Sequence, residues 1–455
     1  MQRTNVGVPA MQTSGRWLVR ALVLAVFLLL AHGGMTQTAW AKVVLEFAHW
    51  DANPGIEKTW ELFNASQDEI EIVYRALPWE AYLESVLLEM ATGAGPDLFS
   101  LMGWETADMN FRVLMRDGLL VDLTPYLERD RDEIGVSEWF PFIIPLASYQ
   151  GKLAGLPYGW SVFNAINYNA DLFDAAGVAY PDDTWTWETL FDASKKFIRA
   201  DGEGNIVTRG LAPGDLSWWA AEAMVWSAGG QVFNDEQTGL ALSAPAARTA
   251  LDRAAQFVIE GAAVDGGAGW GSPTSSVAFR LAALHWATVD KPQYGVVYRT
   301  GLAPTPKDPV TGQRIGNSVE IMLTAVNANT KHSDAAWKAL KFFTENFGRA
   351  SLEGWGMIQF TPVSPSGLEA FLRQGADVLG DPFATDLLTV VPTMAATARL
   401  PEEAVNPVLV DIYPEIKNLL ANEWGKVIDP SQRVPVYQFI ETVSRNVQSR
   451  LAGGE

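Results

Sequence analysis

Residues 43–49 read VVLEFAH, residues 70–75 read IEIVYR and residues 96–102 read PDLFSLM. Between these three short apolar segments, residues 54–66 and 82–92 carry apolar side chains at helical spacing. Strands and helices that alternate in this order predict a parallel sheet with helices on both faces. Ligands of such sheets bind beyond the carboxyl ends of the strands. The residues that follow each strand are therefore the first candidates for a binding site.

Aromatic and acidic residues follow all three predicted strands. Trp50 and Asp51 follow the first strand, Glu80 follows the second, and Trp104 follows the third. A tryptophan ring offers a flat apolar face, and a carboxylate accepts hydrogen bonds from neighbouring hydroxyl groups. We therefore expect these four residues to bind a ligand. The alternatives are a solvated turn for Trp50 and Asp51, and a helix start favoured by the dipole for Glu80.

The middle of the chain continues with strands and helices of similar length. We expect strands over residues 152–157, 161–168 and 316–325, and helices over residues 182–197, 217–229, 243–258 and 333–343. Thr186, Ser243 and Ser333 have the side chains of helix N-caps. The C-terminal part is mostly helical, with several proline breaks. No low-complexity linker divides the chain, which predicts that it crosses between domains more than once.

The first 41 residues have the order of a secretory signal peptide. Arg3, Arg16 and Arg20 precede an apolar run from Ala21 to Ala31, and Ala39-Trp40-Ala41 is a small-x-small cleavage site. The apolar run is about half of the roughly 20 residues that span a bilayer. We therefore expect a cleaved leader rather than a membrane anchor. Because the sequence contains no cysteine, we expect no lipid anchor after cleavage.

Composition excludes several function classes. The formal net charge of −20 argues against nucleic acid, which requires a basic face. With no cysteine and four histidines in total, a zinc site is not expected. The polar turn DGEGN (residues 201–205) is shorter than a calcium loop and lacks its closing glutamate. We expect neither a metal nor a cofactor, whereas the 18 tryptophans suit a ligand with flat apolar faces.

Several further segments occur in the order typical of one protein family. They are GAGPDLF (93–99), LLVDLTPYL (119–127), GLPYG (155–159), NYNADLF (167–173) with AG (176–177), PDDTWTWETL (181–190), AGG (228–230) and the helix that begins AAW (335–337). Together they resemble the family 1 extracellular solute-binding proteins, the maltodextrin-binding type. One segment departs from the pattern: FRLAALHW (279–286) stands where the family has a glycine-containing F-x-x-G-K-A-A-M.

The resemblance implies an α/β fold of the type II periplasmic binding proteins, with two hinge-bending lobes around a central cleft. Lobe one would comprise residues 42–163 and 318–362, and lobe two would comprise residues 164–317 and 363–455. The chain would cross between lobes near residues 161–164, 316–318 and 360–363. Closure of the lobes would then trap a ligand in the cleft.

Further candidate ligand-binding residues lie along this expected cleft. They are aromatic or amide side chains, or a glycine that permits close approach: Tyr158, Trp160, Asn164, Trp218, Trp226, Gly229, Trp270, Trp286 and Asn317. Alternatives stay open for several of them. Trp218 and Trp226 lie eight residues apart on one helix and fit a core. Tyr158 and Trp160 fit inter-lobe packing, the Asn164 amide fits a backbone contact, and Gly229 fits a helix end.

The function implied by the resemblance is capture of a neutral sugar or polyol and delivery to the membrane permease of an ABC importer. The protein would act as a monomer in the periplasm and would not be an enzyme. A secreted glycoside hydrolase is the alternative, since hydrolysis needs only two carboxylates at a suitable separation. The same fold could also bind a phosphorylated polyol, or a polyamine that aromatic and acidic residues would hold.

Overall fold

The computed structural model describes residues 42–102, 111–261, 276–282, 298–316, 319–355, 360–370, 373, 383–399 and 412–452. The expected leader lies outside the described residues, as do the candidate ligand-binding residues Trp104, Trp270, Trp286 and Asn317. Within the described ranges, none of the helices combines the length and the apolar character that a membrane crossing requires.

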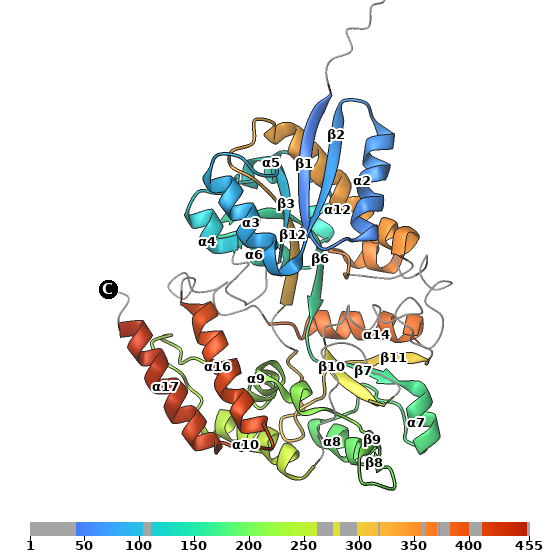
Figure 1. Cartoon of the computed structure of the whole chain (residues 1–455), viewed down its shortest axis with the longest axis vertical. Helices are drawn as coiled ribbons and strands as arrows, with labels where there is room; N and C mark the ends of the chain where they lie inside the picture. The colour runs from blue at the N-terminus through green and yellow to red at the C-terminus, as the bar shows by residue number, and fades with distance from the viewer. Residues whose placement is uncertain are drawn as a thin grey trace, which may run out of the picture. The chain divides into compact units, whose positions relative to one another are not determined.

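The N-terminal strands form a five-stranded sheet in the order β2-β1-β3-β12-β6 (Figure 1). Its strands are β1 (Val43–Trp50), β2 (Ile70–Leu77), β3 (Leu98–Met102), β6 (Gly155–Val162) and β12 (Val319–Val326). β1 and β3 pair in parallel, as predicted, whereas β12 runs antiparallel to both β3 and β6. A strand from much later in the chain thus completes a sheet that the first strands begin.

Helices cover both faces of this sheet, as the apolar spacing predicted. Phe47 of β1 packs against Trp60 of α2 (Pro54–Ser66), with ring centroids 4.9 Å apart, and against Phe343 of α12 (Ser333–Trp355). On the other face, Tyr82 of α3 (Trp79–Ala91) donates a hydrogen bond to the carbonyl of Ala48. Short elements complete this part: α4 (Phe111–Arg116), α5 (Thr124–Arg129), η2 (Val136–Glu138), α6 (Ile143–Leu146), β4 (Ser148–Tyr149) and β5 (Lys152–Leu153).

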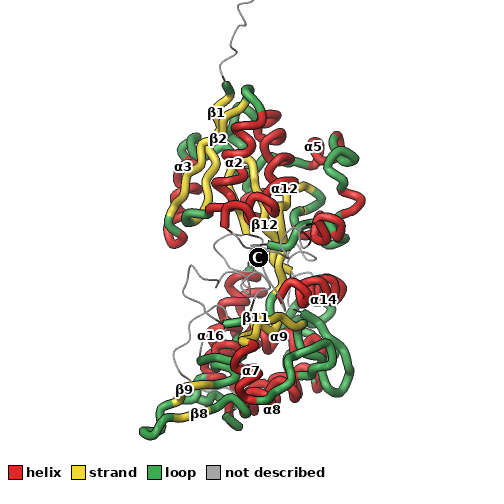
Figure 2. The backbone as a smooth tube through the Cα atoms, turned by 90° about the vertical axis from the view of Figure 1, so that its right-hand side faces the viewer, coloured by secondary structure: helices red, strands yellow, loops and turns green. Residues whose placement is uncertain are grey.

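A second, antiparallel sheet has the order β10-β7-β11. Its strands are β7 (Ala165–Asn169), β10 (Phe279–Ala282) and β11 (Thr300–Ala303). Ile166 and Tyr168 of β7 point into a large apolar core that also contains side chains from the helices around this sheet. Figure 2 shows α14 (Phe383–Ala396) next to β11. The other elements of this part are α7 (Ala170–Ala176), α8 (Trp187–Lys195), β8 (Arg199–Ala200), β9 (Ile206–Thr208), η3 (Pro213–Leu216), α9 (Trp218–Ser227), α10 (Pro245–Ile259), α16 (Tyr413–Ile428) and α17 (Val436–Ala452).

The predicted strand over residues 161–168 is wrong in one respect, because it is two strands. β6 ends at Val162 and β7 begins at Ala165. Asn164 between them adopts a left-handed backbone with φ of 63°, a conformation that asparagine tolerates better than most residues. Its side-chain amide donates a hydrogen bond to the carbonyl of Trp219 over 3.0 Å. The turn lets the chain leave the first sheet and enter the second.

Helix starts agree with the sequence at one cap and differ at another. Thr186 is the N-cap of α8, and its hydroxyl accepts a hydrogen bond from the backbone N–H of Thr189. The predicted cap at Ser243 is wrong, because Ala244 is the N-cap of α10 and Pro245 occupies the first helical position. Proline lacks one of the N–H groups that a cap would otherwise satisfy. The helix expected over residues 333–343 continues to Trp355.

Candidate ligand-binding site

Hydrogen bonds join the turn after β1 to the end of β2. The backbone N–H of Asp51 donates to the carbonyl of Leu77 over 2.6 Å, and the N–H of Trp79 donates to Asp51 Oδ1 over 3.1 Å. The hydroxyl of Tyr74 donates to the Asp51 carbonyl and accepts from the N–H of Asn53. The carboxyl ends of these two strands therefore meet at one edge, as the sequence predicted.

Two tryptophans and two carboxylates stand at this edge, and we call them the aromatic rim: Trp50, Asp51, Trp79 and Glu80. Trp50 is half-buried and lies 5.8 Å from Trp79, with the two rings almost perpendicular at 85°. Trp79 keeps 39% of its surface exposed, and both carboxylates are exposed. An exposed tryptophan is more informative than a buried one, because its apolar surface is left without a partner.

The rim is free of counter-ions within the part of the chain that the structure describes. Neither Asp51 nor Glu80 forms an ion pair with a described residue. Hydroxyl groups of a neutral ligand can donate to such carboxylates. A cationic ligand would also be attracted to them and to the faces of the tryptophan rings. An anionic ligand would be repelled.

Beneath the rim, the sheet face that packs against α12 carries a buried polar row: His49, Ser100, Tyr158, Glu320 and Thr324. The strand register places His49 beside Ser100 and pairs Ser100 with Thr324, and all five residues are buried. Both imidazole nitrogens of His49 and Oγ1 of Thr324 have no hydrogen-bond partner among the described residues. Such groups in native proteins mark ordered water or a functional site.

Burial keeps the buried polar row uncharged near neutral pH. Burial lowers the pKa of His49 to about 3 and raises the pKa of Glu320 to about 8, because each group loses hydration of its charged form. Burial also raises the pKa of the Tyr158 hydroxyl, which faces Ser100. At pH 7 the row therefore presents mostly neutral donors and acceptors beside Trp50, whose ring lies 4.0 Å from that of His49.

The structure places four of the predicted aromatic residues in the core. Tyr158 packs edge-on against Phe343, 5.0 Å away, and the indole N–H of Trp160 donates to the carbonyl of Pro362 over 2.8 Å. Trp218 and Trp226 are at most 2% exposed. These placements favour the packing alternatives for all four residues, and their contact with a ligand stays a prediction.

Two further predicted residues also have a structural role. Asn164 uses its amide on the backbone of Trp219, which favours the backbone alternative. Gly229 has φ of 79°, and its N–H donates to the carbonyl of Trp226 just after the end of α9. Glycine is the usual residue for this left-handed conformation at a helix end. Ligand binding by Asn164 or Gly229 stays a prediction.

The sequence reasoning did not name Trp79, His49 or Glu320 as ligand-binding candidates, although it placed His49 and Trp79 at the edge where β1 and β2 end. Trp79 directly precedes the predicted residue Glu80 and follows the same strand, so its position was the available signal. Glu320 is the one ionisable residue of its strand, VEIMLTAV, and His49 shares the strand VVLEFAHW with Glu46, which pairs with Arg75. An ionisable side chain in such a strand is buried at a cost unless it has a partner or a function.

A cavity of about 650 Å³ lies elsewhere, next to Trp160, and does not suit a hydroxyl-rich ligand. Its lining is almost entirely apolar, with Glu369 as its one ionisable group: Phe140, Pro141, Phe142, Pro365, Leu368, Glu369, Leu388, Pro392, Ala395 and Ala396. A sugar buried there would leave most of its hydroxyl groups without hydrogen bonds, which is unfavourable. The aromatic rim is therefore the better candidate.

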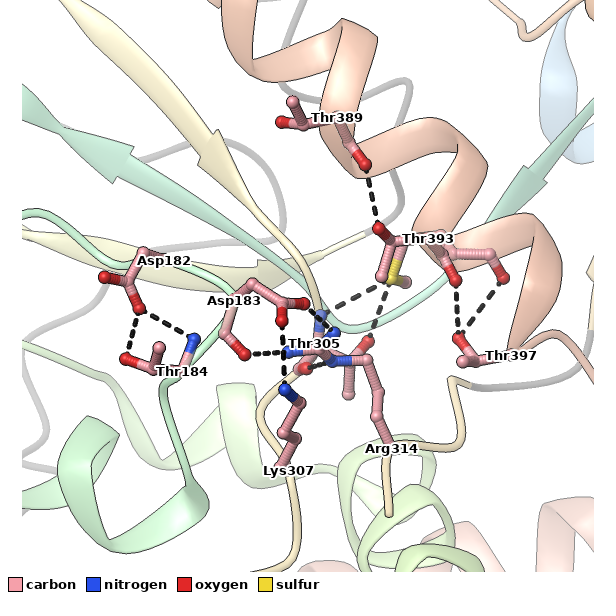
Figure 3. A network of polar contacts seen from close by, with 10 residues as sticks. Asp182, Asp183, Thr184, Thr305, Lys307, Arg314, Thr389, Thr393 and Thr397 are labelled. Carbon is pink, nitrogen blue, oxygen red and sulfur yellow. Dashed lines mark hydrogen bonds and ion pairs between the residues drawn. The ribbon is translucent and has the colours of Figure 1, made fainter. Parts of the chain in front are cut away.

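Cations near the second sheet are already paired (Figure 3). Arg314 Nη1 lies 2.5 Å from Asp183 Oδ1, and Lys307 Nζ lies 3.0 Å from Asp183 Oδ2. These two partners hold the pKa of Asp183 below its usual value. Thr305 contacts the sulfur of Met394 in α14. The network fixes the segment that leads to β12, and it leaves these two cations engaged rather than available to an anionic ligand.

The family model described as bacterial extracellular solute-binding protein matches residues 51–348, which include most of the aromatic rim. The chain belongs to this family. A protein of Brucella abortus (strain 2308), named only as a binding protein, is 24% identical to this solute-binding protein over 318 residues. That match covers 68% of this chain and 73% of the relative.

Solved structures of other solute-binding proteins share the fold. The ABC substrate-binding protein from Listeria monocytogenes, in complex with cycloalternan, gives a TM-score of 0.70 at 19% identity and covers 90% of this chain and 99% of that one. A solute-binding protein from Thermotoga lettingae bound with α-D-tagatose gives a TM-score of 0.68 at 16% identity and covers 90% of this chain and 100% of that one. A solute-binding protein from Agrobacterium radiobacter K84 in complex with ribitol gives a TM-score of 0.63 at 20% identity and covers 90% of this chain and 98% of that one.

These similarities confirm the expected fold, an α/β protein of the two-lobe periplasmic solute-binding type. They also confirm the family resemblance that the ordered segments indicated. The residue boundaries of the lobes and the three crossing points stay predictions.

Proposed function

We propose that this solute-binding protein captures a sugar or polyol at the aromatic rim and delivers it to the permease of an ABC importer. The observation that carries the proposal is the rim itself, in which an exposed tryptophan stands beside a second tryptophan and two carboxylates without counter-ions. A sugar or polyol matches these groups with apolar C–H faces and with hydroxyl donors. The similar proteins that are in complex with cycloalternan, tagatose and ribitol support this ligand class.

The protein would bind its ligand and release it unchanged. It would act as a monomer in the periplasm, after removal of the leader expected in residues 1–41 and without a lipid anchor. The description of the family as extracellular supports this location. The remaining predicted residues of the cleft, including Trp104, Trp270, Trp286 and Asn317, would complete the site from segments outside the described residues.

A polyamine is the second candidate ligand, because the two exposed carboxylates beside tryptophan rings also suit a cation. A phosphorylated polyol fits less well. The carboxylates of the rim would repel its negatively charged phosphate group. Arg314 and Lys307, which could attract that group, are paired with Asp183.

Thermal melting of residues 42–455 against sugars, polyols, phosphorylated polyols and polyamines tests the proposal. Ligand at a hundredfold excess over Kd adds about 2.7 kcal/mol of stability, which raises the Tm by a few degrees in a chain of this size. We expect a shift with a sugar or polyol that is afterwards recovered unchanged. Recovery of the ligand as smaller sugars would support a hydrolase. A shift in Tm with spermidine alone would show that the ligand is a polyamine and not a sugar or polyol.

Trp79→Ala tests the rim as the binding surface. We expect a loss of affinity of tenfold or more with little change in Tm, because Trp79 is exposed and contributes little to the core. Tyr437→Ala is the matched control, since Tyr437 is an aromatic side chain that is 53% exposed on α17. Equal affinities of the two variants would place the ligand away from the rim.

A further inference from the structure

We propose that Asp51 is a positioning residue, which orients Trp79 for the ligand rather than binding the ligand itself. The inference rests on the proposed function and narrows it: Glu80 remains the rim carboxylate that meets the ligand, and Asp51 has a different role from the ligand contact that its position in the sequence predicts. Three observations carry it: the hydrogen bond that Asp51 accepts, the missing cap of α3, and the backbone conformation of Asp51.

Asp51 supplies a cap that α3 lacks in its own sequence. The N-cap of α3 is Pro78, which makes no side-chain capping bond. The first N–H groups of a helix have no partner within the helix and need one from outside. Asp51 Oδ1 accepts the N–H of Trp79, the first residue of α3, over 3.1 Å. A carboxylate at this position is also favoured by the positive end of the helix dipole.

The backbone of Asp51 holds the carboxylate in place for this bond. Its φ of 51° is left-handed, a conformation open mainly to glycine, asparagine and aspartate. Its N–H donates to Leu77 and its carbonyl accepts from the Tyr74 hydroxyl, both in or at the end of β2. The turn is therefore tied to the strand that leads directly into α3.

The consequence for the site is the direction of the Trp79 ring. Because Trp79 is the first residue of α3, the geometry of the first helical turn sets where its side chain points. The ring lies almost perpendicular to that of Trp50, at 85°. If the Asp51 bond is lost, the first turn of α3 can fray and the ring loses this fixed orientation.

Two variants at position 51 and one control at another position separate the roles of side chain, charge and backbone. Asp51→Asn keeps an oxygen acceptor and tolerates the left-handed backbone, but it removes the charge. Asp51→Gly keeps the backbone conformation and removes the acceptor. Gln150→Gly is the matched control, because Gln150 is another exposed residue with a left-handed backbone, at φ of 48°, and lies away from the rim in the turn between β4 and β5.

The first readout needs no ligand. Two tryptophan rings this close give a coupled signal in the far-ultraviolet circular dichroism spectrum. The Trp79→Ala variant, which lacks one of the two rings, identifies that signal. We expect Asp51→Asn and Gln150→Gly to keep the signal and Asp51→Gly to lose most of it. An unchanged signal in Asp51→Gly would overturn the proposal.

The second readout is the affinity for maltotriose, D-tagatose and ribitol by calorimetry. We expect Asp51→Asn to bind within threefold of the wild type, and Asp51→Gly to bind at least tenfold more weakly. In a Trp79→Ala background, Asp51→Gly should cost no further affinity, because coupled residues are non-additive. Additive losses, or an Asp51→Asn loss as large as that of Asp51→Gly, would make Asp51 a direct contact. If the wild type binds none of the three, the proposed ligand class fails, while the spectra still decide the positioning role.

Discussion

His49 and Glu320 lie buried on the same face of one sheet, and their ionisation affects stability in opposite directions. The pKa of His49 falls from 6.5 to about 3 on folding, so the folded state binds fewer protons between these values and is stabilised as pH rises. The pKa of Glu320 rises from 4.5 to about 8, so the folded state binds more protons and loses stability as pH rises. Between pH 4.5 and 6.5 the two effects oppose each other.

Glu320→Gln should therefore remove an alkaline loss of stability. In the wild type we expect the free energy of unfolding to fall between pH 6.5 and 8, by up to about 1.4 kcal/mol per pH unit. Glutamine has nearly the same shape and does not ionise. Urea unfolding at pH 6, 7 and 8 measures the difference between the two proteins. Parallel curves would show that Glu320 does not carry this pH dependence.

His49→Phe should remove an acid loss of stability and leave the alkaline one unchanged. As the pH falls below 6.5, the unfolded chain protonates this histidine, whereas the folded protein keeps His49 neutral. The free energy of unfolding of the wild type therefore falls until about pH 3. Phenylalanine also replaces two polar atoms that have no partner among the described residues, which is favourable when shape is kept. Unfolding curves at pH 4, 5 and 6 test this, and a less stable variant at all three values would contradict it.

At the scale of elements, β11 approaches β7 so closely that one position accepts only glycine. A Cβ atom on Gly301 would lie within 2.4 Å of the Tyr168 ring. The hydroxyl of Tyr168 is in turn bonded to Asp386 of α14, which also accepts the N–H of Leu302. The small residue therefore lets a strand, an aromatic ring and a helix meet at one point.

Gly301→Ala should destabilise the protein by about 1–3 kcal/mol, the usual cost of added volume in a packed core. Gly239→Ala is the matched control, because a Cβ atom there meets nothing within 4 Å. Equilibrium unfolding in urea compares the two variants with the wild type. Equal stability of the two variants would mean that β7 and β11 separate without cost.

The elements show what the sequence could and could not predict. Periodicity was sufficient for β2, α2 and α3, and short apolar runs were sufficient for β1 and for β3, which is buried along its whole length. The break at Asn164 could not be read from periodicity, because a single left-handed residue leaves the alternation of its neighbours unchanged. Aromatic residues of the candidate site were harder still. Trp160 and Trp218 are covered by residues distant in sequence, such as Pro362 and Trp424, so their burial depends on tertiary structure.

At the scale of the whole molecule, β12 is the element on which the first sheet depends. It pairs with β3 on one side and with β6 on the other, so β6 has no other neighbour in that sheet. The sequence predicted this strand, but not its position between the two others. Pairing between strands so distant along the chain requires a long loop to be closed first.

A chain that ends at residue 318 should therefore fail to fold cooperatively, although it contains β1, β2, β3 and β6. We expect a broad thermal transition in circular dichroism and binding of the dye ANS to exposed apolar surface. Residues 42–452, which lack only the last three residues, should melt like residues 42–455. A sharp transition in the shorter chain would show that the first sheet is stable without β12.

The place of β12 also has a consequence for biosynthesis. β6 is complete when residue 162 has left the ribosome, but the strand that must pair with it follows only at residues 319–326. Non-local pairings of this kind form slowly, and an emerging chain cannot make them before their second partner exists. If the leader predicted in residues 1–41 directs export, the chain has to stay unfolded until it has crossed the membrane. The topology would then supply that delay, because the first sheet can close only after residues 319–326 have been made.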